Sequence, residues 1–163
     1  MAEPELVQSF RFEVLLTLGA AGKPPQLLGN GAFAECGGLE LEADVKEYLE
    51  GGFNSGVIRR VGRVKLQPLV LKRGIMVPEG GKYMDTAFWD WLTAMVSGAL
   101  PVLRCDGHIR VSNPHNTQKV AHWSFTRGLP VKLTGPALNA KTGEIAIEEL
   151  HIAHEGLQLE AKP

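Results

Sequence analysis

The chain has 163 residues, of which 44% are hydrophobic and 21% charged, and its formal net charge is only −1. This composition is typical of a soluble globular protein and excludes a largely disordered chain. The small net charge argues against a general nucleic-acid or membrane-surface binder, and no apolar run approaches the ~18 residues that a membrane helix needs. The length predicts a single domain over residues 1–163 that buries roughly two-thirds of its unfolded surface.

Glycine and proline are frequent, with 19 and 10 copies, and many of them separate alternating runs, which indicates a turn-rich β protein. The N-terminus carries Glu3 and Glu5 without a basic region, so we expect no signal peptide. Two cysteines, Cys36 and Cys105, are too few for a disulfide framework. We expect them to remain unpaired in a reducing cytosol.

Charge is segregated along the chain. Residues 35–50 contain six acidic residues and one lysine, whereas residues 59–73 contain six basic residues and no acidic one. Two interpretations stay open at this point. The segments are two solvated surface faces, or the acidic edge of one copy meets the basic edge of the next.

The first half of the chain predicts extended structure. Residues 6–18 alternate and predict a long strand, with Leu16 on one face and Glu13 on the other, and residues 19–30 form a loop. Residues 33–49 are extended or helical, because alternation from Leu39 to Lys46 competes with a helical spacing of Leu41, Val45, Tyr48 and Leu49. Residues 51–56 predict a mobile connector.

The middle of the chain contains one strong helix. Residues 64–73 predict a strand in which Pro68 marks an edge or a bulge, followed by a loop over 76–82. A helix is predicted over 85–97, capped by Asp85 and ended by Gly98. Its apolar stripe packs on a sheet and comprises Met84, Phe88, Trp91, Leu92, Met95 and Val96.

The C-terminal part predicts further strands. Residues 108–112 and 120–126 predict a hairpin around the turn-forming residues 113–117. The alternation slips by one residue within 144–159, which indicates a bulge near Glu148 and Glu149 or a strand with both faces covered. We favour a strand that leaves its own core and meets another subunit.

No catalytic, metal or cofactor site is predicted. His151 and His154 are three residues apart and point to opposite faces of a strand, unlike the paired histidines of a zinc site. The basic segment 59–73 has no aromatic residue for stacking bases, so we expect no nucleic-acid binding. A metal-dependent enzyme and a monomeric binding barrel remain as alternatives.

Several segments together resemble the inner tube proteins of contractile phage tails and phage-tail-like injection systems, which are related in fold to the type VI secretion haemolysin-coregulated protein. Their shared order and spacing carry the resemblance. The segments are FRFEV (10–14), FAECGGL (33–39), EYLEGGFN (47–54), LVLKRG (69–74), WDW (89–91), PVKLTGP (130–136) and IEELHIAHEG (147–156).

This resemblance implies a mainly β (α+β) fold: an antiparallel β-barrel or sandwich with one flanking helix, its sheet continued across subunits in a hexameric ring. Rings would stack into a hollow tube inside a contractile sheath, and the protein would be structural and not an enzyme. Implied partners are further copies of the chain, sheath, baseplate, hub and spike proteins, and tape-measure or cargo proteins in the lumen. Assembly would take place in the bacterial cytoplasm, without a membrane anchor, before the chain becomes part of a tail or particle. The alternative within the family is a tube-initiator paralogue that joins tube to baseplate.

The resemblance places the 47–54 motif and the acidic run before it in an extended loop that reaches toward the next ring. It implies the following contact candidates: Glu40, Glu42, Asp44, Glu47, Tyr48, Glu50, Gly51, Gly52, Asn54, Lys72, Arg73 and Gly74. The pairing of the acidic with the basic segment between copies is our own hypothesis. The polar alternates Arg11, Glu13 and Thr17 are candidates for the lumen lining.

Overall fold

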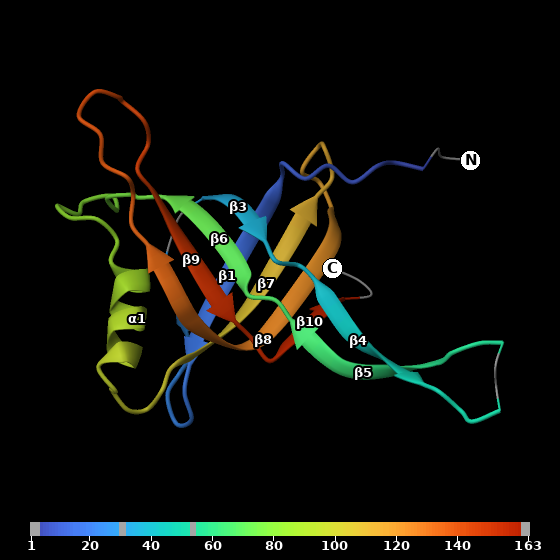
Figure 1. The fold of residues 1–163 in the computed structure, drawn as a ribbon. Helices are drawn as coiled ribbons and strands as arrows, with labels where there is room; N and C mark the ends of the chain where they lie inside the picture. Colours follow the sequence, from blue (N-terminus) through green and yellow to red (C-terminus); the bar gives the residue numbers. More distant parts are fainter. Residues whose placement is uncertain (1–3, 30–31, 53–54, 161–163) are drawn as a thin grey trace.

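The computed structural model describes residues 4–29, 32–52 and 55–160. It is a mainly β protein with antiparallel strands and, in the described ranges, a single helix (Figure 1). The strands are β1 Phe12–Gly19, β2 Gln26–Leu27, β3 Phe33–Gly37, β4 Leu41–Tyr48, β5 Ile58–Leu66, β6 Leu69–Gly74, β7 Arg104–Ser112, β8 Lys119–Thr134, β9 Ile147–Ala153 and β10 Gly156–Leu159. The helix α1 is Ala87–Val96.

Two sheets share the long strand β8. The first sheet has the order β2-β1-β7-β8-β10, and the second has the order β8-β9-β6-β3. The first part of β8 pairs with β7 and β10, whereas residues 129–134 pair with β9. Between these parts Arg127 has a φ of 55°, at an irregularity in the β7–β8 register. The irregularity lets one strand belong to both layers of the body.

The core lies between the two sheets and under the helix. Its buried residues include Leu16, Leu69, Leu71, Ile109, Phe125, Leu150 and Ile152 from the strands and Phe88 and Trp91 from α1. Phe125 packs over Gly107 of β7, where a Cβ atom would overlap the aromatic ring. Glycine is therefore required at position 107 because no side chain fits beside Phe125.

In the N-terminal half, the strand predicted from the alternation is confirmed, but it begins later than predicted. β1 begins at Phe12, and the residues before it stay outside the sheet, with Leu6 88% and Phe10 63% exposed. Residues 41–48 are a strand and not a helix. This confirms the strand that the family resemblance favours over 39–48, where periodicity alone is ambiguous. The loop over 19–30 contains the short strand β2, paired with the end of β1.

The strand predicted over 64–73 is wrong as one element. It is divided between two strands that belong to different sheets. β5 ends at Leu66 and β6 begins at Leu69, with Gln67 and Pro68 between them. Proline lacks a backbone N–H and fixes its φ, so a strand readily ends there. Pro68 therefore separates the projecting β4–β5 pair from the body.

The helix is shorter than predicted, although its buried face is largely right. The Asp85 carboxylate accepts a hydrogen bond from the Ala87 N–H at 2.9 Å, and Gly98 follows the helix with a φ of 75°. Phe88 and Trp91 are buried, and the Trp91 Nε1–H donates to the Leu103 carbonyl. Val96 does not belong to the packed stripe, because it is 77% exposed.

The strand β9 corrects the interpretation of the C-terminal alternation. It pairs with β6 on one side and β8 on the other, and its register with β6 has no irregularity. No bulge lies at Glu148; its side chain shares the inward face with Leu150 and Ile152 and is 1% exposed. β9 is thus central in its own core and does not leave it for another subunit.

Candidate functional site

The β4–β5 pair projects from the body as an arm, defined here as residues 41–52 and 55–66 (Figure 1). Its two strands form a sheet of their own and pair with each other over most of their length. An isolated two-stranded hairpin is marginally stable in water at best. The arm is therefore the part of the molecule that most needs a partner.

One face of the arm is apolar and uncovered. Residues directly opposite each other in an antiparallel pair point to the same face, and the β4–β5 register matches Leu41 with Leu66, Ala43 with Val64 and Val45 with Val61. The exposed fractions are 62% for Leu41, 62% for Val45 and 78% for Val61. We call these six residues the apolar face of the arm. A contiguous exposed apolar surface of this kind marks an interaction site.

The other face of the arm is charged, and its ion pairs are internal. Lys65 Nζ lies 2.7 Å from Asp44 Oδ1, and this carboxylate raises the pKa of Lys65. The Arg60 guanidinium lies over the Tyr48 ring at 5.0 Å. A third pair lies on the apolar face, next to Val45 and Val61, where Arg59 Nε is 3.3 Å from Glu47 Oε1.

These contacts change the interpretation of the segregated charges. The acidic and basic segments follow each other antiparallel in one chain, so Glu47–Arg59, Asp44–Lys65 and Glu35–Lys72 pair within the subunit. Three of the acidic side chains are therefore paired within the subunit. The pairing of an acidic edge with a basic edge between copies stays a prediction.

The predicted contact residues fall in two places. The arm and its base contain Glu40, Glu42, Asp44, Glu47, Tyr48, Glu50, Gly51 and Gly52, all exposed or half-buried. Asn54 lies outside the described residues. Sequence reasoning missed the apolar residues of the second strand of the arm. A register irregularity opposite Ala43–Val45 puts Val61 and Val64 three residues apart, which hides their shared face from a search for alternation.

Arg73 does not belong among the contact residues, because it is 2% exposed inside its own subunit. Its Nε lies 2.6 Å from Glu148 Oε1 on the neighbouring strand, and its Nη1 lies 3.1 Å from Asp85 Oδ2. The guanidinium lies 3.8 Å from the centre of the Phe88 ring, and the Trp89 Nε1–H donates to Glu148 Oε2. This cluster holds β6, β9 and α1 together. It also explains why the acidic residue Glu148 occupies an inward position of β9.

Lys72 and Gly74 flank Arg73 and are less buried. Lys72 Nζ lies 2.8 Å from Glu35 Oε2. The hydrogen bond to the Glu35 carboxylate raises the pKa of Lys72. Gly74 ends β6 opposite Ile147. Both remain candidates for contacts between copies.

The outward face of the first sheet is largely polar, with the 39% exposed Leu15 between two of the three lumen candidates, Glu13 and Thr17. Glu13 lies opposite Arg110, and its carboxylate is 3.2 Å from Lys119 Nζ. Thr17 lies opposite Asp106 on the same face. Arg11 precedes the strand and lies against the Phe10 ring, with 5.3 Å between its guanidinium carbon and the ring centre. A polar layer thus covers the side of this sheet that faces away from the core.

A histidine pair lies on this polar layer. His108 Nδ1 and His122 Nε2 are 2.9 Å apart on adjacent strands. Burial lowers the pKa of His122, and the nearby Arg110 and His108 lower it further. His122 is accordingly expected to stay neutral near pH 7.

The two C-terminal histidines do not converge on a common site. His151 Nε2 is 2.5 Å from Glu149 Oε1, whereas His154 is buried with its Nε2 3.1 Å from the Gln67 carbonyl and its ring against Phe125. Among the residues that the structure describes, no group of three or more metal-ligating side chains gathers. Both cysteines are free thiols, and burial raises the pKa of Cys36 to about 11 and of Cys105 to about 12. In the same ranges, no helix has the length and apolar character needed to span a membrane.

A model of the T4-like virus tail tube protein gp19 family matches residues 8–158. The chain belongs to this family. The family predicted from the sequence is confirmed, and the protein is a structural tube protein and not an enzyme. The tube-initiator alternative is not favoured by the comparisons. A search of curated protein sequences found no significant match.

Solved structures share the fold. The anti-feeding prophage tube-terminating cap is 21% identical over 98% of this chain and 94% of that chain, with a TM-score of 0.73. A chain of the PVC sheath-tube complex, from an extracellular contractile injection system, is 21% identical over 96% of this chain and 92% of that chain, with a TM-score of 0.72. A crystal structure of Hcp protein is 10% identical over 91% and 92%, with a TM-score of 0.50. At these identities the likeness supports the predicted mainly β fold with one helix.

Proposed function

We propose that residues 1–163 act as a single tail-tube domain whose copies form hexameric rings, and that the rings stack into the hollow inner tube of a contractile tail or injection system. The observation that carries this proposal is the uncovered apolar face of the arm in a chain of the tail tube family. A surface of this kind calls for a permanent neighbour, and the arm has the length to reach one. Each of its eight- and nine-residue strands spans on the order of 25–30 Å.

The arm is the proposed contact between neighbouring copies and toward the next ring. Its tip around Glu50, Gly51 and Gly52 lies at the end of the arm away from the body (Figure 1). Lys72 and Gly74 are proposed to lie near a subunit boundary. Sheet continuation between copies would also cover the open edges of both sheets, which otherwise invite aggregation.

The polar outward face of the first sheet is the proposed lumen lining. Glu13 and Thr17 belong to it, Arg11 lies beside it, and the His108–His122 pair extends it. A water-filled channel needs such a polar surface, while the opposite face of the same strands supplies the core. Tape-measure or cargo proteins would pass along this lining.

The remaining partners follow from the tube role. We propose contacts with a sheath around the tube and with baseplate, hub and spike proteins at its end. Assembly would take place in the bacterial cytoplasm, before the tube becomes part of a phage tail or a released or anchored particle.

The test is to purify the chain and measure its mass over a range of concentrations, with negative-stain electron microscopy of the same samples. The expected result is six-fold rings at intermediate concentration and stacked rings or tubes at high concentration. A single small species at every concentration would support the monomeric binding barrel and refute the proposal.

A further inference from the structure

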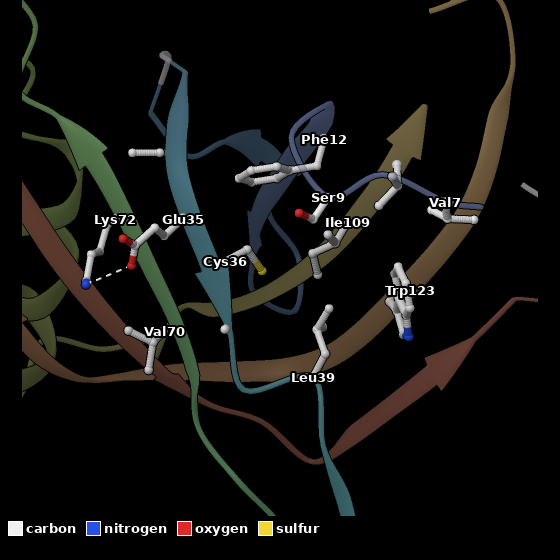
Figure 2. A pocket seen from close by; sticks show the side chains of 13 residues that line it. Val7, Ser9, Phe12, Glu35, Cys36, Leu39, Val70, Lys72, Ile109 and Trp123 are labelled. Carbon is white, nitrogen blue, oxygen red and sulfur yellow. Dashed lines mark ion pairs between the residues drawn. The ribbon is translucent and has the colours of Figure 1, made fainter. Parts of the chain in front are cut away.

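Two histidines lie side by side on the outward face of the first sheet. A cavity of about 510 Å³ opens between the two sheets, and Ile109 of β7 and Trp123 of β8 line it (Figure 2). Each of these residues follows a histidine in the chain, His108 and His122. Because successive side chains of a strand point to opposite faces, both imidazoles point away from the cavity. Both histidines are half-buried, so solutes can reach them.

Strand pairing brings the two rings into contact. His108 lies opposite Ser124, and His122 lies opposite Arg110, so the histidines are diagonal neighbours on one face of the sheet. His108 Nδ1 and His122 Nε2 are 2.9 Å apart, and the ring centres are 5.0 Å apart. The two residues are 14 positions apart in the chain, which explains why the sequence predicts no metal site from them.

The separation of the two nitrogens suits a metal ion. A bond between a metal and an imidazole nitrogen is about 2.0–2.1 Å long, so two ligands at right angles around the ion are about 2.9 Å apart. Two ligands of a tetrahedral ion are about 3.3–3.4 Å apart. The 2.9 Å between the histidine nitrogens therefore matches adjacent positions of a square-planar or octahedral ion. Cu²⁺ and Ni²⁺ combine such geometries with a preference for imidazole.

The charged side chains around the pair balance one another. Arg110 lies opposite His122. Its guanidinium and the Lys119 ammonium are 3.7 and 3.2 Å from the Glu13 carboxylate. On the other side of His122 lies Glu160, whose N–H donates to the His122 carbonyl at 2.8 Å. Two positive and two negative side chains thus neighbour the histidines, so their net charge does not repel a cation.

The pair supplies two protein ligands. The nearest carboxylate, that of Glu160, accepts a hydrogen bond from Ser124 Oγ at 2.5 Å. Within the described ranges, no third metal-ligating side chain joins the two histidines. A bound ion would therefore complete its coordination with water.

We propose that His108 Nδ1 and His122 Nε2 chelate a divalent transition-metal ion, with Cu²⁺ preferred over Ni²⁺. In a pair of neutral rings, one facing nitrogen donates a proton to the other. When the ion binds, this proton moves to the outer nitrogen of its own ring, so both facing nitrogens offer a lone pair and no proton is released. The site belongs to one chain and does not depend on ring formation. In the proposed tube it would face the lumen.

The test titrates Cu²⁺ into the metal-free full chain near neutral pH. Calorimetry measures the affinity and the number of ions per chain, and electron paramagnetic resonance counts the nitrogens bound to each ion. His108→Gln and His122→Gln each remove one ligand and keep a polar side chain on the outward face. The matched controls are His115→Gln, in an exposed turn, and His151→Gln, on the second sheet. Urea denaturation without metal verifies that every variant is folded.

The expected result is one tightly bound Cu²⁺ per chain, with two imidazole nitrogens in its spectrum. Each ligand variant should lower the affinity by more than about tenfold, because even the outer partners of metal ligands are typically worth about 10–100-fold. Both control variants should bind the ion like the wild type. Wild-type affinity in His108→Gln or His122→Gln would overturn the inference. A single imidazole nitrogen in the wild-type spectrum would overturn it as well, and this readout requires no variant.

Discussion

The body and the arm use ion pairs in opposite ways. In the body, Arg73 and Glu148 are almost fully buried and fix β6, β9 and α1 around one another. In the arm, Glu47 and Arg59 form a pair whose side chains are 56% and 70% exposed. Buried pairs are costly to break from one side, whereas exposed pairs contribute little to stability.

The apolar residues differ in the same direction. The body buries Leu69, Leu150 and Ile152 completely, whereas the arm leaves Val45 and Val61 largely exposed. The body therefore has a core of its own, whereas the arm has an apolar face that its own subunit leaves exposed. The difference indicates that stability and assembly are carried by separate regions, which can be perturbed separately.

The largest expected effect comes from Arg73→Ala. Removing the guanidinium leaves the Glu148 carboxylate buried without its partner and exposes the Phe88 ring to a cavity, so the free energy of unfolding should fall by about 3–5 kcal/mol. Urea denaturation measures the loss. Lys72→Ala changes the neighbouring residue on the opposite face and should cost far less. Equal losses in the two variants would contradict the division between a self-sufficient body and an exposed surface.

The second effect separates assembly from folding. Val45→Thr with Val61→Thr keeps β-branched side chains but puts two hydroxyl groups on the apolar face of the arm. Burying an unpaired hydroxyl costs about 1–3 kcal/mol, so the concentration needed for assembly should rise at least about tenfold. The monomer should unfold at nearly the same urea concentration.

Lys46→Thr is the matched control for this variant, because Lys46 points to the opposite face of the arm. Sedimentation over a range of concentrations measures both variants. Assembly of the double variant at the wild-type concentration would mean that the apolar face is not an interface.

A smaller effect concerns pH. The pKa of His122 lies below its ordinary 6.5 because of burial and the nearby Arg110 and His108. As pH falls below 6.5, the unfolded chain binds a proton that the folded chain does not, so the free energy of unfolding decreases. His122→Gln should weaken this dependence, and His115→Gln, in an exposed turn, is the control substitution. Urea midpoints measured from about pH 7.5 to about pH 5.5 provide the comparison.

The smallest effect is expected in the exposed pair of the arm. Glu47→Gln should lower the free energy of unfolding by less than about 1 kcal/mol, and added salt should reduce even this difference. Denaturation at low and high ionic strength measures it. A loss as large as that of Arg73→Ala would show that the arm is part of the cooperative body.

Local patterns were sufficient for much of the fold. Alternation predicted β1, the β7–β8 hairpin and the polar face of Glu13 and Thr17, while the 3.6-residue spacing predicted the helix around Phe88 and Trp91. The same patterns failed where a partner distant in the sequence decides the outcome. Glu148 looked like a break in the alternation because its buried partner Arg73 lies 75 residues away.

The sequence by itself determined the family, the β class and the existence of one helix, because these depend on motifs and on the periodicity of neighbouring residues. Only the tertiary structure decided which charges pair within the subunit and which apolar residues stay uncovered. Antiparallel pairing brings Glu47 to Arg59 and aligns Val45 with Val61, and a register irregularity that no local pattern reveals sets this alignment. The physical reason is that burial and charge pairing depend on distances between residues far apart in the chain, and the fold alone fixes those distances.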